Sequence, residues 1–273
     1  MGRSFQDIFW TTLRPMNSQF KSKKVADVPA GRGLSSSYLK SLGAEVYPFD
    51  LVPDFFEAKD LKCQFCDLNQ SLPLDSGSMD FILSQEGIEH ISDQHLAFRE
   101  FSRVLKMGGR LILSCPNGSS MKSRFSFLMG ECEKSGQIMP PNLFDSIWFN
   151  PGVKDQIYFG HLFIPTASKL RVLAEVNGLE VEKIYFSHLK FSNLVLFLLL
   201  YPWMWLSQKL NLMKNIRKRP ALKEEYRKAF KLSMSPKVLL DGALVMQFKK
   251  VMEPEQSVKS LNQKWSHWQK NAP

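Results

Sequence analysis

The sequence predicts an α/β fold with a doubly wound, mostly parallel sheet, and three observations support this. Between residues 24 and 186, short apolar runs of strand length alternate with longer runs of helical periodicity. Turns that contain glycine or proline separate these runs, as at 29–33 and 108–109. The helical runs are long enough to carry the chain across the sheet, which keeps successive strands parallel and places helices on both faces.

Each element can be placed in order along the chain. A strand at 24–28 leads through a turn into a helix at 34–42, and strands at 45–50 and 62–66 flank a short helix near Phe55. The remaining elements continue the alternation. They are a strand at 79–84, a helix at 93–106, a strand at 110–114, a helix at 165–177, and strands at 179–186 and 243–249.

Length and composition fit one folded domain with insertions. The chain has 273 residues, of which 44% are hydrophobic and 23% charged, and this excludes a disordered, collagen-like or coiled-coil protein. We expect a single domain over 1–252 with insertions at 117–163 and 187–238, followed by a poorly ordered polar tail at 253–273. Four cysteines and an N-terminus without an apolar signal core indicate a reducing, cytoplasmic setting.

An acidic residue and two glycines after the first strand indicate a cofactor site. Ligands of doubly wound sheets bind at the carboxyl ends of the strands. Asp27 ends the first strand and can face an ammonium group, while Gly31 and Gly33 let the backbone approach a ligand. A dinucleotide is disfavoured, because Ser36 replaces the third glycine of its fingerprint and Asp27 would repel a pyrophosphate.

Two further carboxylates narrow the choice of ligand. Asp50 ends the second strand, where a carboxylate can accept both hydroxyls of a ribose. Asp67 follows the third strand and can accept from the amine of adenine, while Leu68 covers the ring. Taken singly, each carboxylate is also typical of an ordinary turn at the end of a strand. Together, positions for a ribose, an adenine and an amino-acid group predict S-adenosylmethionine.

The successive motifs resemble those of class I S-adenosylmethionine-dependent methyltransferases. In order they are VADVPAGRG, PFD, CDLNQSLPLDSGSMDFILSQEGIEHI and EFSRVLKMGGRLILSCPN. The similarity covers about residues 24–186 and 243–249, and it points to enzymes of ubiquinone biosynthesis and to bacterial enzymes that act on glycans or lipid-linked acceptors. The resemblance implies a seven-stranded sheet of order 3-2-1-4-5-7-6 with its last strand antiparallel, and S-adenosylmethionine as the cofactor.

One position departs from the family pattern. Pro29 stands where the family usually has glycine, and proline has no N–H and cannot adopt a positive φ. The first turn of the loop must therefore differ, but Gly31 and Gly33 keep the positions nearest the ligand, so we expect binding to be retained. Gln85, after the fourth strand, is expected either to contact the cofactor or, with Glu86, to cap the next turn.

Two histidines are the candidate catalytic residues. In similar methyltransferases the segment before the sixth strand closes over the active site and often carries a histidine, which implies that His161 is a base or an orienting residue on the acceptor side. His90 is the second candidate, and either histidine could instead be structural. Asn117, just beyond the fifth strand, is a candidate contact for the acceptor.

The cysteine spacing predicts no metal site. Cys63 and Cys66 form a Cys-x-x-Cys pair, but a structural zinc site needs four ligands, and Cys115 and Cys132 are not spaced as a second pair. Residues three apart on a strand also point to opposite faces of the sheet.

An apolar stretch followed by a basic one lies between the last two strands. Residues 191–208 carry no charge, whereas 209–231 hold nine basic and two acidic residues, a net charge of +7 in a protein of +10. A single membrane crossing is excluded, because the last strand must return to the same sheet. We expect an interfacial helix on an anionic membrane, with Tyr201, Trp203 and Trp205 at headgroup depth. A hydrophobic lid or a dimer interface is the alternative, and nucleic acid is not expected, because stacking aromatics do not interleave the basic residues.

The sequence therefore predicts a methyltransferase that uses S-adenosylmethionine and acts on a small or lipid-linked acceptor, as a cytoplasmic protein at the membrane surface. The alternative is a noncatalytic membrane-associated protein that retains the fold. A nucleotide-binding oxidoreductase is a third hypothesis, and it requires NAD binding.

Overall fold

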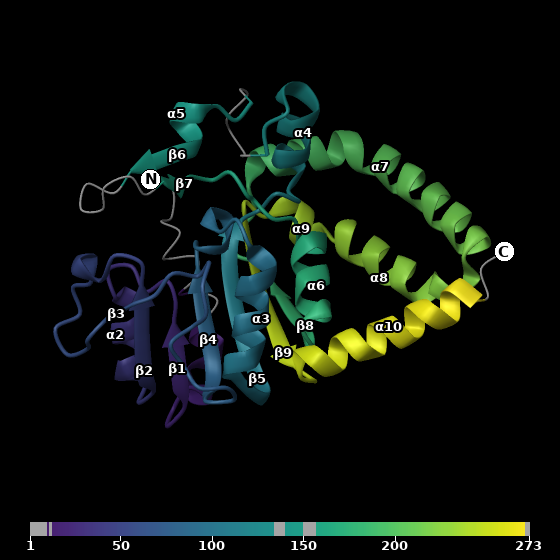
Figure 1. Cartoon of the computed structure of the whole chain (residues 1–273). Coiled ribbons are helices and arrows are strands. Elements are labelled where there is room, and N and C mark those ends of the chain that lie inside the picture. Colours follow the sequence, from purple (N-terminus) through teal and green to yellow (C-terminus); the bar gives the residue numbers. More distant parts are fainter. Residues whose placement is uncertain (1–9, 11–12, 134–139, 150–156, 271–273) are drawn as a thin grey trace.

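The computed structural model describes residue 10 and residues 13–133, 140–149 and 157–270. Seven strands form one sheet, in the order β3-β2-β1-β4-β5-β9-β8 (Figure 1). Strand β9 is antiparallel to both β5 and β8, and the other pairs are parallel. The predicted order 3-2-1-4-5-7-6 is confirmed, since β6 and β7 form a hairpin apart from the sheet. The sheet strands are β1 Lys24–Asp27, β2 Glu45–Asp50, β3 Gln64–Phe65, β4 Met79–Gln85, β5 Leu105–Pro116, β8 Leu179–Tyr185 and β9 Ala243–Lys250.

Helices cover both faces of the sheet, as the doubly wound pattern predicts. Successive side chains of a strand point to opposite faces, so β4 supplies Phe81 and Leu83 to one core and Ile82 to the other. The first core lies under α2 and the 3-10 helix η1, and the second lies under α3 and α6. These helices are η1 Arg14–Gln19, α2 Leu34–Ser41, α3 Gln94–Val104 and α6 Ala167–Val176.

Side-chain caps fix where α3 and α6 begin. The Asp93 carboxylate accepts a hydrogen bond from the Leu96 N–H at 2.9 Å, and Thr166 Oγ1 accepts one from the Lys169 N–H at 3.2 Å. Gly178, with φ of +76°, ends the turn after α6 and leads directly into β8. These caps hold both helices in register with the carboxyl ends of the strands.

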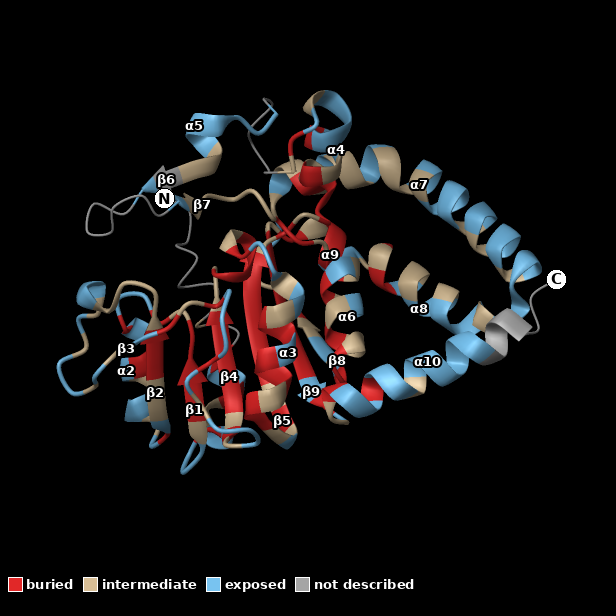
Figure 2. Ribbon diagram, in the orientation of Figure 1, coloured by how far each residue is buried: buried red, intermediate tan, exposed pale blue. Residues whose placement is uncertain are grey.

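Helical segments extend from the sheet in the two predicted insertions. The first insertion, 117–163, includes residues 134–139 and 150–156, which lie outside the described residues. The second contains α7, 28 residues long, which continues through Pro202 and is mostly exposed (Figure 2). No helix among the described residues is both long and apolar enough to cross a bilayer. The insertion elements are α4 Met121–Gly130, α5 Leu143–Ser146, β6 Ile147–Phe149, β7 Ile157–Phe159, α7 Phe191–Lys218, η4 Pro220–Leu222, α8 Lys223–Ser233 and α9 Pro236–Leu240.

Three expectations need correction. The third strand has two residues instead of five, and the segment near Phe55 is the 3-10 helix η2, Pro53–Phe55. Strand β5 begins at Leu105 rather than at 110, because Leu105 already pairs with Met79 and the strand passes through Gly108 at φ of +77°. The tail is not poorly ordered over its described part: α10, Pro254–Lys270, packs against α6, and Ser257 Oγ donates to the Glu175 carbonyl at 2.7 Å.

Candidate active site

A cavity of about 380 Å³ opens at the carboxyl edge of the sheet. The ends of β1, β2 and β4 and the residues after β3 form its floor, and the hairpin of β6 and β7 contributes Phe149, Ile157, Tyr158 and Phe159. A mostly apolar cavity of this size with a few polar groups is typical of a small-molecule site. Its polar lining comes from Asp50, Asp67, Asn69, Glu86 and His90.

Asp50 lies where the sequence predicts a ribose-binding carboxylate. One oxygen accepts the Gly31 N–H at 2.8 Å and the other accepts the Val52 N–H at 2.9 Å. The carboxylate therefore joins the glycine loop, residues 29–33 after β1, to the end of β2. Each oxygen retains a further lone pair, and the residue lines the cavity, so a ligand hydroxyl can still donate to it.

Asp67 and Leu68 both line the same cavity. Asp67 Oδ1 accepts from the Asn69 N–H at 2.9 Å and from the Asn69 amide at 3.1 Å, which fixes the turn after β3. Leu68 is buried and belongs to the core below the cavity floor. The predicted pair of an acceptor beside an apolar cover is thus present in one place.

Asp27 is near the cavity but does not line it. Its side chain is fully buried, and Oδ2 accepts a hydrogen bond from Ser36 Oγ at 2.6 Å. Oδ1 has no hydrogen-bond partner among the described residues. Burial is the main reason that the pKa of Asp27 is raised to about 7, and the charge of Asp50 adds to the effect. Direct contact of Asp27 with a ligand therefore stays a prediction.

The glycine loop has the left-handed backbone that its residues allow. Gly31 and Gly33 have φ of +52° and +81°, and a Cβ on Gly33 would lie 2.5 Å from the Phe56 ring. Neither glycine lines the 380 Å³ cavity, so their contact with a cofactor also stays a prediction. Pro29 lines it, and its ring packs against Gly87, where a Cβ would lie 2.5 Å from the proline Cδ.

Of the two residues expected to contact the cofactor or cap the next turn, Glu86 lines the cavity and Gln85 does not. Gln85 Oε1 accepts from Ser35 Oγ at 2.5 Å and does not line the cavity, so its contact with the cofactor stays a prediction. Glu86 does line the cavity and has a positive φ of +47°. Burial raises the pKa of the Glu86 carboxyl, and the nearby Glu89 raises it further. A buried carboxyl of this kind would favour a positively charged neighbour.

Glu89 brings the two predicted histidines together. Its side chain is fully buried, and neither carboxylate oxygen has a hydrogen bond among the described residues. One oxygen lies 3.9 Å from His90 Nε2 and 4.0 Å from His161 Nε2, and the two imidazole centroids are 5.0 Å apart. Burial raises the pKa of the Glu89 carboxyl. The donor atoms of the three groups lie within 4.8 Å of one another.

Each histidine faces a different cavity. His90 lines the 380 Å³ cavity, and His161 lines a second, larger one of about 1270 Å³ between α3, α4 and α6. His90 Nδ1 lies 2.8 Å from the Phe159 carbonyl oxygen, within hydrogen-bond distance. The Gln94 amide donates to the carbonyls of Ile88 and Phe163 at 2.9 and 2.7 Å. These bonds join the segment after β4 to the segment that carries His161.

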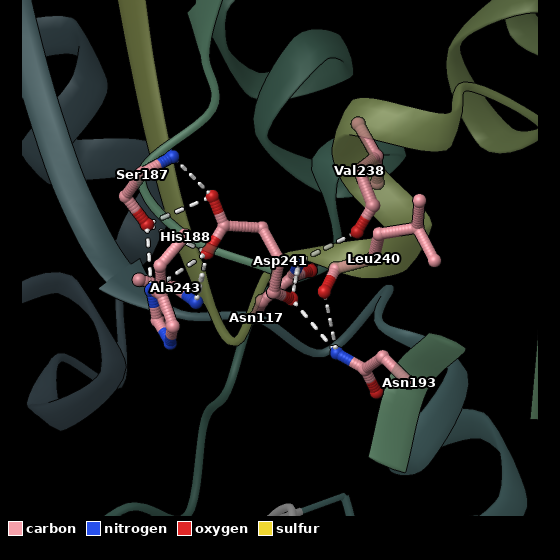
Figure 3. Close-up of polar contacts among 8 residues, drawn as sticks. All are labelled: Asn117, Ser187, His188, Asn193, Val238, Leu240, Asp241 and Ala243. Carbon is pink, nitrogen blue, oxygen red and sulfur yellow. Dashed lines mark hydrogen bonds and ion pairs between the residues drawn. The ribbon is translucent and has the colours of Figure 1, made fainter. Parts of the chain in front are cut away.

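Asn117 makes hydrogen bonds within a buried polar cluster and lines neither cavity in the described structure. It is buried, and its amide nitrogen donates to the carbonyls of Val238 and Asp241 at 2.7 and 2.9 Å (Figure 3). Its oxygen accepts the Ser119 N–H at 2.9 Å. The hypothesis that Asn117 contacts the acceptor is wrong for this arrangement, because the side chain is buried and lines neither cavity in the described structure.

Asp241 is the centre of that cluster. Its carboxylate accepts from the Ser187 N–H at 2.5 Å, from Ser187 Oγ at 2.7 Å and from the Ala243 N–H at 3.1 Å (Figure 3). The Asn193 amide of α7 donates to the carbonyls of Leu240 and Asp241. Ser187 Oγ also lies 3.1 Å from His188 Nδ1, and the same nitrogen lies 3.5 Å from an Asp241 oxygen. A relay that activates a serine uses the two different ring nitrogens of its histidine, so this arrangement is not one. The cluster anchors the start of α7 to the sheet.

Comparisons with known proteins agree with this geometry. Residues 26–113 match the model of a family described as a methyltransferase domain. A ubiquinone biosynthesis O-methyltransferase of Xanthomonas oryzae pv. oryzae is 33% identical over 107 residues, covering 34% of this chain and 43% of that protein. The chain thus spans less than half the length of the curated relatives it matches.

Solved structures extend the likeness to most of the chain. An S-adenosylmethionine-dependent methyltransferase from Mesorhizobium loti has a TM-score of 0.51 at 15% identity, covering 89% of this chain and 97% of that one. One from Archaeoglobus fulgidus has a TM-score of 0.52 at 14% identity, covering 90% and 94%. At these identities the likeness concerns the fold alone.

The matched methyltransferase domain, the curated relatives and the shared fold together support a class I S-adenosylmethionine-dependent methyltransferase family for this chain. This family implies S-adenosylmethionine as the cofactor, and the 380 Å³ cavity has suitable chemistry for it. Asp50 offers acceptors for sugar hydroxyls, Asp67 offers an acceptor for an amine, and Leu68 offers an apolar wall. The expectation that the methyltransferase holds no metal stays a prediction.

Sequence reasoning missed Glu89 and the aromatic hairpin. Glu89 lies three residues after Glu86 and directly before His90, and two acidic residues around the apolar Gly87 and Ile88 were a detectable signal. The hairpin residues come from the insertion whose sequence has no motif, so their position over the cavity depends on the tertiary fold.

Proposed function

We propose that the protein transfers the methyl group of S-adenosylmethionine to an acceptor atom that carries a proton. The observation that supports this is the cluster of Glu89, His90 and His161, because one histidine lines each of two neighbouring cavities. The smaller cavity would hold the cofactor through Asp50, Asp67 and Leu68, with Asp27, Gly31, Gly33 and Gln85 supporting the loop and strand ends around it.

The larger cavity would hold the acceptor. Phe127, Val172 and Leu173 supply apolar walls, and Asp93, His95 and Lys169 supply polar groups. This mixture suits an amphiphilic molecule whose reacting group is polar. A lipid-linked acceptor is favoured over a fully polar one, and we propose that it is reached at a membrane surface through residues 191–231, on the cytoplasmic side.

Bound S-adenosylmethionine supplies an electrophilic methyl group on a positively charged sulfur. The protein's own contribution is to orient the acceptor and to remove its proton. His161 Nε2 would take that proton, and the Glu89 carboxylate, 4.0 Å away, would stabilise the imidazolium that forms. His90 would keep Glu89 in place from the cofactor side. The aromatic hairpin would exclude water from the reacting atoms.

The first test is binding, followed by turnover with a matched pair of variants. Calorimetry should detect S-adenosylmethionine and its demethylated product, and labelled cofactor incubated with a lipid extract should yield a labelled product. His161→Gln should lower turnover by about 100-fold or more while the cofactor Kd stays within twofold. His188→Gln is the control, because His188 lies beside Asp241 and lines neither of the two cavities in the described structure.

The pH profile tests the role of Glu89. Its raised pKa means that the carboxyl loses its proton above the ordinary glutamate range, so turnover should rise with pH on a limb well above pH 4.5. Glu89→Gln should flatten that limb. Cofactor binding without any labelled product would support the noncatalytic alternative. Equal turnover by wild type and His161→Gln would show that His161 is not the base.

A further inference from the structure

Helix α7 carries an apolar stripe that the described part of the molecule leaves uncovered. Asn193 is its one buried residue, although the helix is 28 residues long. The other face packs inward, where Phe197 and Tyr201 stack at 4.2 Å and the Tyr201 hydroxyl donates to the Met234 carbonyl at 3.4 Å. Residues three and four apart share one side of a helix. The exposed stripe consists of Val195, Leu198, Leu199, Trp203, Leu206, Leu210 and Met213.

Two further helices, α4 and α5, also expose large apolar side chains. Helix α4 contacts α7, and its Leu128 and Met129 side chains are 78% and 62% exposed. On α5, Leu143 is 64% and Phe144 90% exposed. Helices α5, α4 and α7 follow one another along the upper margin of the molecule in Figure 1, beyond the carboxyl ends of the parallel strands. We call the α7 stripe together with Leu128, Met129, Leu143 and Phe144 the apolar face.

The charge beside the apolar face indicates its partner. Glu224 and Glu225 are paired with Arg227 and Lys228, so the acidic residues of 209–231 do not neutralise the end of α7. Among the described residues, no carboxylate lies within ion-pair distance of Lys214, Arg217 or Lys218. Lys209 Nζ lies 5.8 Å from the centre of the Trp205 ring, as in a cation placed beside an interfacial aromatic. A positive surface next to exposed aliphatic and aromatic side chains is complementary to anionic lipid.

We propose that the apolar face lies flat on an anionic bilayer, with the carboxyl edge of the sheet turned toward the lipid. The stripe spans 18 residue steps, about 27 Å along the helix, which suits a helix lying in the interface. A second copy of the chain is a poorer partner, because it would bring the same net positive charge to the contact. The delivery of an acceptor from the bilayer rests on the proposed function, but lipid binding itself does not.

Vesicle binding tests the proposal without turnover. The full-length protein should bind vesicles containing phosphatidylglycerol and should bind neutral phosphatidylcholine vesicles much less. Replacing Lys214, Arg217 and Lys218 with Gln should lower the partition coefficient on anionic vesicles by roughly 100-fold. The control triple, Lys21→Gln, Lys59→Gln and Lys62→Gln, removes the same charge elsewhere and should have a much smaller effect. Leu199→Glu should also reduce binding, whereas Met107→Glu, which is 57% exposed against 63% for Leu199 but lies near the start of β5, should not.

A fluorescent label locates the contact. In a Cys63→Ser background, an environment-sensitive dye on Leu199→Cys, Leu128→Cys or Phe144→Cys should brighten on anionic vesicles, and a dye on Met107→Cys should not. Equal binding to neutral and anionic vesicles, or a dye response at position 107 equal to that at 199, would overturn the proposal. A dimer that buries position 199 and does not bind vesicles would overturn it as well. Cofactor affinity measured on the same variants should be unchanged, so that loss of lipid binding is distinguished from failure of the proposed function.

Discussion

The strand region and helix α7 differ in where their large apolar side chains go. In residues 24–116, Phe98, Phe101 and Leu111 are completely buried between the sheet and its helices. In α7, Trp203 is 73% and Leu198 is 68% exposed. The first region is stabilised by its own core, whereas α7 is held by its inner face and by the hydrogen bonds around Asp241. The buried core and the largest exposed apolar surface of α7 therefore lie in different parts of the chain.

The largest expected effect is on stability, and it compares a buried core side chain with an exposed side chain of α7. Phe98→Ala should lower the free energy of unfolding by about 3–5 kcal/mol, because it leaves a cavity in the core. Trp203→Ala should change it by less than about 0.5 kcal/mol, because the side chain has few partners within the molecule. Urea denaturation followed by circular dichroism measures both. A cost for Trp203→Ala comparable to that for Phe98→Ala would show that the outer face of α7 is covered within the protein.

Replacing each of two buried aspartates by asparagine should change the free energy of unfolding in opposite directions. Asp241 accepts several hydrogen bonds, so Asp241→Asn should lower the free energy of unfolding by about 1–3 kcal/mol. Asp27 has an oxygen without a partner, and its folded-state pKa of about 7 is above the ordinary 3.8. The folded state thus binds the Asp27 proton more tightly, and stability is lost as the pH rises from about 4 through 7.

Asp27→Asn should therefore stabilise the cofactor-free protein at pH 8, by on the order of 2 kcal/mol, and have little effect near pH 4. Denaturation curves at the two pH values measure this change. If Asp27→Asn is less stable than the wild type at pH 8, the charged Asp27 carboxylate must accept a stabilising hydrogen bond or ion pair in the folded protein.

The smallest effect concerns the contact between Pro29 and Gly87. Gly87→Ala should lower S-adenosylmethionine affinity by about tenfold, or 1.4 kcal/mol, since the new Cβ would lie 2.5 Å from the proline ring and force the loop to move. Pro29→Ala combined with Gly87→Ala removes the ring and should recover part of the affinity. Calorimetry measures the S-adenosylmethionine affinity of each variant. Equal affinity of Gly87→Ala and wild type would show that the contact between Pro29 and Gly87 does not affect cofactor binding.

Much of the sheet could be predicted from the sequence, because its strands carry strong local patterns. The bounds of β2 agree with the prediction, and Asp50, Asp67 and Leu68 come together at one cavity, as their places at strand ends indicate. The depth of Asp27 could not be predicted, since the position of Ser36 above it depends on how α2 packs. Likewise, His90 and His161 are 71 positions apart, and only the tertiary fold places Glu89 between them.

Helix α10 shows a different reason for failure. Its composition is polar and suggests a free tail, yet Pro254 at its start and a buried Ser257 bonded to Glu175 fix its first turn against α6. A proline followed by Glu255 is a helix-start signal that outweighs the mean polarity.

The short distance between Ser187 and Asp241 has an architectural consequence. The chain leaves the sheet after β8 and returns to it before β9 at nearly the same point, with the Ser187 N–H 2.5 Å from an Asp241 oxygen. Because exit and return are neighbours, the strands on either side could be joined by a tight reverse turn without altering their pairing. The stretch between Ser187 and Asp241 can therefore differ in length without disturbing the pairing of β8 with β9.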